Sequence, residues 1–204
     1  KTSPAEVAAF THTLSLFYMH EIATLTDQPD RASYYAKRYQ DNARAYHAKF
    51  FNNATDLRVG TASGVRCCYG VGSQTSNLFA LHISAVPSTY REVTAKSLVN
   101  AITTDNAASR KTGQPHMVVG LFGVTWLFDV LADLGEVDLG LKILSQTTQP
   151  SLGYMIDNGA TTLWEGWDGT AHTIGHSTSR NHIMFGGGVN RFIMRTVAGL
   201  WIGE

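Results

Sequence analysis

Apolar side chains recur at helical spacing along nearly the whole chain, and this periodicity constrains the fold more than any other feature. From Pro4 to about Leu25 they return every three or four residues. The next residues, Asp27-Gln28-Pro29-Asp30, indicate a helix stop and restart with Asp27 as the cap, and a second helix continues to Phe50. Further helices are predicted over residues 73–86, 88–102, 116–134, 137–147 and 182–200. The pattern therefore predicts an all-α protein.

The connections between these helices alternate between short turns and long loops. Long loops are predicted over residues 57–72, 103–114 and 149–180. Helices joined tightly in pairs are typical of an array of antiparallel helical hairpins, in which the long loops lie at one end. We expect the polar and aromatic residues of interest to collect at that end. No linker divides the chain, so residues 1–204 are predicted to form a single unit.

The charge composition narrows the classes of partner. Basic and acidic residues balance at 16 each, which argues against a nucleic-acid or anionic-membrane surface. Charged residues make up 16% of the chain, below the roughly 25% of ordinary domains. We therefore expect part of the surface to be covered by a partner. No apolar run is long enough to span a membrane.

The cysteines and the start of the chain give little information about the function of the protein. Cys67 and Cys68 are adjacent, so a loop-closing disulfide between them is not expected, and the absence of a CxxC pair gives no zinc signal. Asn53-Ala54-Thr55 is a single glycosylation acceptor pattern and slightly favours secretion. The chain begins at Lys1 without an initiator methionine or signal peptide, and we expect it to be processed or to be a piece of a longer protein.

The most informative stretch is GATTLWEGWD, residues 159–168, predicted to be a loop or short strand. It places two indoles around two carboxylates. Indole faces stack on the C–H faces of sugars, and glycoside hydrolysis needs two carboxylates, so Glu165 and Asp168 are candidates for that chemistry. The alternative is that Trp164 and Trp167 are packing residues and Glu165 is a capping or salt-bridging group.

Other polar residues have weaker signals. His172 and His176 are four apart but lie in a loop rich in Gly, Thr and Ser, which does not favour zinc. Ser179 or Asn181 is a candidate cap for the last helix. The glycines at 186–188 either bring the backbone close to a neighbour or a ligand, or break the helix. They do not form a phosphate loop, and no metal or cofactor is expected.

Seven short stretches together resemble the catalytic domain of bacterial and fungal α-L-rhamnosidases, glycoside hydrolase family 78. They occur in the family's order and at similar spacing. The stretches are Gly72-Ser73-Gln74-Thr75, Gly120-Leu121-Phe122-Gly123, Gln146-Thr147-Thr148-Gln149-Pro150-Ser151, Gly153-Tyr154-Met155, residues 159–168, Ser179-Arg180-Asn181-His182 and Met184-Phe185-Gly186.

The resemblance implies an (α/α)6 barrel of six helical hairpins and an inverting hydrolase that releases L-rhamnose. Glu165 matches the general base, which activates water, while Trp164, Trp167 and His182 match residues that line the sugar pocket. Asp168 is then not the second catalytic carboxylate, because an inverting pair stands roughly 6.5–9.5 Å apart. The remaining predicted substrate-binding residues are Asp168, Asn181, Tyr154 and His116.

The chain departs from the family pattern in several places. The family's acidic motif Glu-Arg-x-Gly-Trp, which carries the general acid, does not occur in it. Its length suffices for about six or seven helices, roughly half of a twelve-helix barrel, and it resembles the C-terminal half. Gly166 replaces an Arg, Leu152 a Trp, and Asn190-Arg191 an acidic-aromatic pair.

Half a barrel would expose apolar helix faces, so we predict a companion N-terminal half or a second copy as partner, the latter giving a homo-oligomer. Three hypotheses remain open. The chain is a hydrolase fragment that is active only with the missing half, a lectin-like carbohydrate-binding protein derived from a rhamnosidase half-barrel, or a structural remnant without a ligand.

Overall fold

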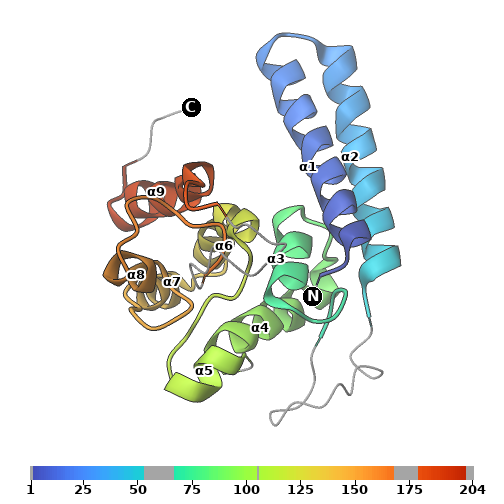
Figure 1. Ribbon diagram of the computed structural model, residues 1–204. Coiled ribbons are helices and arrows are strands. Elements are labelled where there is room, and N and C mark those ends of the chain that lie inside the picture. Colours follow the sequence, from blue (N-terminus) through green and yellow to red (C-terminus); the bar gives the residue numbers. More distant parts are fainter. Residues whose placement is uncertain (1, 53–66, 105, 168–178, 201–204) are drawn as a thin grey trace. The chain divides into compact units, whose positions relative to one another are not determined.

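The computed structural model describes residues 2–52, 67–104, 106–167 and 179–200. Helices are the regular elements of these ranges, and an isolated bridge joins Phe51 and Tyr69 (Figure 1). The chain divides into two compact units, Lys1–Leu98 and Val99–Glu204. That residues 1–204 act as one unit stays a prediction.

The first unit begins with an antiparallel hairpin of α1 (Pro4–Leu25) and α2 (Pro29–Phe50), as the periodicity predicted (Figure 1). Ser3 caps α1 by accepting the Glu6 N–H at 3.1 Å, and a proline stands in the first turn of both helices. The hairpin packs on α3 (Gln74–His82), where the rings of Phe10 and Phe79 stack with their centroids 3.8 Å apart. This contact places the core of the unit between the N-terminal half of α1 and the second half of α3.

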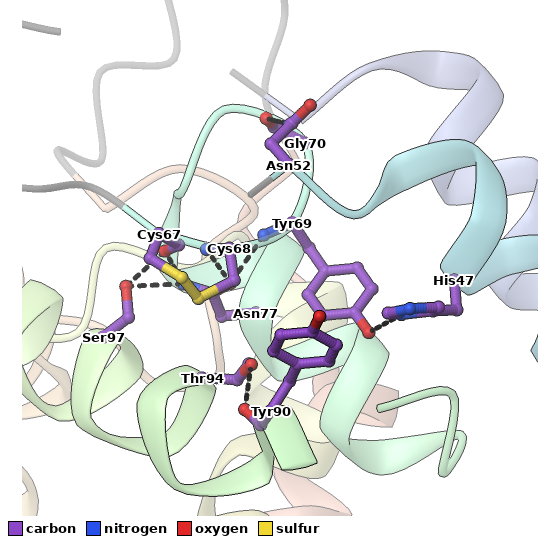
Figure 2. Close-up of a disulfide and its surroundings, with 10 residues drawn as sticks. All are labelled: His47, Asn52, Cys67, Cys68, Tyr69, Gly70, Asn77, Tyr90, Thr94 and Ser97. Carbon is purple, nitrogen blue, oxygen red and sulfur yellow. Dashed lines mark hydrogen bonds between the residues drawn. A yellow bond between two sulfur atoms is a disulfide. The ribbon is translucent and has the colours of Figure 1, made fainter. Parts of the chain in front are cut away.

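The two adjacent cysteines of this unit are joined by a disulfide, which the sequence argument did not expect (Figure 2). Because it joins neighbours, it closes no loop of chain. Both residues are buried beside α3, where the amide of Asn77 accepts the N–H groups of Cys68 and Tyr69 at 3.1 and 3.0 Å. The same amide donates to the Cys67 carbonyl at 2.8 Å. One buried side chain therefore satisfies three backbone groups of this turn.

Helix α4 (Ser88–Thr103) was predicted, whereas α5 (Ala107–Thr112) was not. The six residues of α5 have no apolar periodicity, and the segment was expected to be a loop. Its ends explain why it is helical: Asn106 accepts the Ser109 N–H at 2.8 Å, and Gly113 ends the helix in the left-handed conformation at φ 69°.

The second unit contains α6 (Leu121–Asp133) and α7 (Val137–Leu144), close to the predicted helices. Helix α6 starts five residues later than expected, after an extended segment. A further helix, α8 (Leu152–Asp157), lies within the expected 149–180 loop and is capped by Ser151, which accepts the Tyr154 N–H at 2.9 Å. Its six residues are too few to show a helical period.

The predicted helix over 182–200 is a succession of three short elements: η1 (Ile183–Gly186), α9 (Gly187–Arg191) and the π-helical η2 (Phe192–Val197). The change of helix type coincides with the glycines at 186–188. A Cβ built on Gly188 would lie 2.3 Å from the Thr125 carbonyl oxygen, so α9 lies with its backbone against α6. The expectation that these glycines allow a close backbone approach is confirmed at Gly188.

Candidate active site

Residues 159–167 contain neither helix nor strand, as expected, and run beside residues 179–182. Two backbone hydrogen bonds join the segments: Glu165 donates to the Ser179 carbonyl at 2.8 Å, and His182 donates to the Leu163 carbonyl at 2.8 Å. These bonds bring the candidate base and the candidate sugar-binding histidine onto neighbouring segments, although 16 residues of chain lie between them.

The Glu165 side chain is exposed, and one of its oxygens is held. Oε2 accepts the main-chain N–H of Ser179 at 2.8 Å. Among the described residues, no hydrogen bond or ion pair is formed with the other oxygen, Oε1. An exposed carboxylate fixed through one oxygen is able to take a proton from water through the second, which is the task of a general base.

The two indoles anchor this segment. Trp164 is only 6% exposed, and the guanidinium carbon of Arg180 lies 5.2 Å from the centroid of its ring. Trp167 is half-buried, and its Nε1–H donates to the Val119 carbonyl at 2.8 Å. In the conformation described, both rings pack against protein, which agrees with the packing alternative. Their role in sugar binding stays a prediction.

Asn181 and His182 lie beside the base through the backbone pairing. Asn181 is exposed, and its N–H donates to Ser179 Oγ at 3.1 Å. His182 is half-buried where its N–H meets the Leu163 carbonyl. Their predicted contacts with sugar are compatible with this placement and remain to be tested.

His116 lies in a different setting, with 0% of its surface exposed. Its Nδ1 donates to the Gln114 carbonyl at 2.9 Å, which leaves Nε2 to accept from Thr148 Oγ1 at 2.8 Å. The ring therefore ties two loops of the second unit together in this conformation, and it shows no surface to a solute. Tyr154 is half-buried on α8. For both residues, substrate binding stays a prediction.

Some predicted residues lie outside the described ranges: Asn53, Asp168, His172 and His176. In the described ranges, no group of three or more His, Cys, Asp or Glu side chains is placed to hold a metal ion. None of the helices described is long and apolar enough to cross a membrane.

Three contacts of this region were not anticipated from the sequence. Ser179 holds the Glu165 carboxylate, and Arg180 covers the Trp164 ring. Arg191, noted as a departure from the family pattern, forms an ion pair with Asp129 on α6, where its Nε lies 3.0 Å from Oδ1. Each pair joins residues at least 14 positions apart, a proximity that no local pattern reveals.

Comparison with known proteins decides the family. The model of the bacterial α-L-rhamnosidase six-hairpin glycosidase domain matches residues 1–197. The chain belongs to this family. It is an all-helical portion of a six-hairpin glycosidase domain, so the expected fold class is confirmed.

Individual α-L-rhamnosidases agree with this assignment. The chain is 33% identical to one from Streptomyces avermitilis over 132 residues, 63% of this chain and 12% of the relative. A relative from Formosa agariphila is 29% identical over 184 residues, 88% of this chain and 18% of the relative.

Solved structures show the same fold. The α-L-rhamnosidase of Dictyoglumus thermophilum matches with a TM-score of 0.75 and 31% identity, over 96% of this chain and 20% of that one. The Streptomyces avermitilis enzyme complexed with L-rhamnose matches with a TM-score of 0.71 and 26% identity, over 95% and 17%. This rhamnosidase-family chain thus spans a fifth or less of the length of these relatives.

Proposed function

We propose that this chain supplies the general base and part of the sugar site of an inverting α-L-rhamnosidase. The observation that carries the proposal is the exposed Glu165 carboxylate, held by Ser179 through one oxygen, within a chain that matches the rhamnosidase domain over residues 1–197. The complex of a relative with L-rhamnose supports the choice of sugar.

The reaction assigns Glu165 one step. Its carboxylate accepts a proton from water while the water oxygen attacks the anomeric carbon from the face opposite the glycosidic bond. A second carboxyl group, in its acid form, protonates the departing glycosidic oxygen, so the products are L-rhamnose of inverted configuration and a free alcohol. The acid stands roughly 6.5–9.5 Å from the base, with room for the water. We propose that a part of the catalytic domain outside this chain supplies it.

The proposed partner is therefore the remainder of the six-hairpin domain. Each unit of the chain has apolar side chains left in solvent. In the first unit they include Ile22 and Leu25 of α1, and in the second unit they include Met194 and Val197 of η2. A closed ring of hairpins covers such faces, whereas a portion of a ring leaves them open.

The test of this function is hydrolysis of a chromogenic α-L-rhamnoside. The chain is assayed alone and after addition of the preceding part of the catalytic domain, each beside Glu165→Gln. We expect Glu165→Gln to lower kcat by about 10²–10⁴-fold, since the amide cannot accept the proton. Glu92→Gln, an exposed carboxylate on α4, is the matched control and should retain turnover. Full turnover by Glu165→Gln would exclude Glu165 as the base.

The lectin-like alternative makes a different prediction. A carbohydrate-binding protein would bind L-rhamnose, lose that binding in Trp164→Ala, and show no turnover in either assay. Calorimetric titration of the chain with L-rhamnose separates the two cases. Because Trp164 is buried under Arg180 in this structure, the hydrolase is the function that the site supports better.

A further inference from the structure

Glu165 and Ser179 are joined twice, once in each direction. The Glu165 N–H donates to the Ser179 carbonyl, and the Ser179 N–H donates to Glu165 Oε2, both at 2.8 Å. The first bond fixes the two backbones relative to each other. The second fixes the carboxylate relative to both.

The donor in this second bond is itself well placed. The main-chain N–H of Ser179 belongs to a segment that is tied to residue 163 through the His182 N–H. Ser179 Oγ also accepts the Asn181 N–H at 3.1 Å, which orders the turn between them. A glutamate side chain has several freely rotating bonds, and an exposed one samples many rotamers unless a partner holds it. A backbone donor on an anchored segment is such a partner.

We propose that the main-chain amide of Ser179 is a positioning group for the general base. It holds Oε2 and directs Oε1 toward the attacking water, so that the carboxylate need not be ordered during each turnover. The inference rests on the proposed function for its catalytic consequence, because it assumes that Glu165 is the base. The hydrogen bond itself is testable independently of any activity.

The independent test is nuclear magnetic resonance of the whole chain labelled with ¹⁵N-serine. A backbone amide bonded to a carboxylate reports the protonation of that carboxylate in its own chemical shift. We expect the Ser179 amide to move with pH in the native chain and to lose this response in Glu165→Gln. An amide that does not respond, or responds equally in Glu165→Gln, would overturn the proposal.

The catalytic test uses two substitutions at the same residue, in whichever preparation turns over rhamnoside. Ser179→Pro removes the N–H, whereas Ser179→Ala keeps it and removes only the hydroxyl. We expect Ser179→Pro to lower kcat at least about tenfold relative to Ser179→Ala, with KM within about twofold, because a misplaced base affects the chemical step more than binding. Equal kcat values would refute the positioning role.

A backbone ester at position 179 is the second variant, in case Ser179→Pro fails to fold. It replaces the N–H by oxygen without fixing φ, and should reproduce the loss of kcat. If no preparation hydrolyses rhamnosides, the proposed function fails, while the amide response still decides whether Ser179 holds the carboxylate.

Discussion

Glu6 is a carboxyl buried in the first turn of α1, with 1% of its surface exposed. The Tyr46 hydroxyl donates to Oε1 at 3.3 Å and the Ser76 hydroxyl donates to Oε2 at 3.2 Å. Burial raises the pKa of Glu6, and the hydrogen bonds from Ser76 and Tyr46 only partly oppose it. The helical periodicity did not single out this residue, because its burial depends on contacts with α2 and α3.

The raised pKa of Glu6 predicts a stability that falls as pH rises. Above the pKa of the unfolded chain, the folded state retains a proton that the unfolded state has released, so the free energy of unfolding declines until pH passes the folded pKa. Glu6→Gln removes this dependence and should raise the free energy of unfolding of the first unit at pH 7, with no gain near pH 4. Urea unfolding across pH 4–8 measures it, with the exposed Glu21→Gln as control. Parallel profiles for Glu6→Gln and the native chain would contradict the expectation.

At the candidate site, too, the sequence reveals local patterns but not the contacts that folding creates. The role of base stays a prediction; Glu165 was proposed for it from a short local pattern, an acid between two indoles, and from the family resemblance. Its contact with Ser179 was not predicted, because the contact spans 14 residues and depends on two loops lying side by side. The burial of His116 was missed for a similar reason: its partner Thr148 is 32 residues away.

At the scale of elements, periodicity predicted helices that are long and half-buried. It located α1 and α2 because apolar residues recur at helical spacing many times in an amphipathic helix of 22 residues. It missed α5 and α8, which have six residues each and are stabilised as helices by capping side chains and buried polar contacts. It also predicted one helix over residues 182–200 where the structure has three elements, because the close packing of glycines does not change the spacing of apolar residues.

The contact of α9 with α6 predicts opposite effects for two adjacent glycines. Gly188→Ala would place a methyl group 2.3 Å from the Thr125 carbonyl oxygen, so we expect a loss of about 1–3 kcal/mol. At Gly187 no atom lies within 4 Å of the added Cβ, so Gly187→Ala should be neutral or stabilising by up to about 1 kcal/mol. Thermal unfolding of the two variants measures the difference. A Gly188→Ala variant as stable as Gly187→Ala would show that α9 does not pack on α6 through its backbone.

At the scale of the whole chain, the low charged fraction and the exposed apolar residues both indicate a surface that a partner covers. Charged residues make up 16% of the chain, and α1 leaves Ile22 and Leu25 with 53% and 83% of their surfaces exposed. These two side chains and the half-exposed Tyr18 lie at positions i, i+4 and i+7, which form one face of the helix. Soluble proteins seldom expose a contiguous apolar face to water, and such a face is typical of a surface that contacts a partner.

The exposed face of α1 therefore predicts association through it. We expect the chain to elute in size-exclusion chromatography with light scattering as a species heavier than one chain, or to become so when the preceding part of the catalytic domain is added. Ile22→Glu with Leu25→Glu should reduce this association at least tenfold, because two charges would be buried against an apolar partner. Ser33→Glu with Gln40→Glu adds the same charge at exposed polar positions of α2 and should retain the association.

A chain that stays monomeric under both conditions would show that nothing covers this face, and would also count against the proposed partner. Association that survives the α1 substitutions would instead direct attention to Met194 and Val197 of η2, the second exposed apolar face.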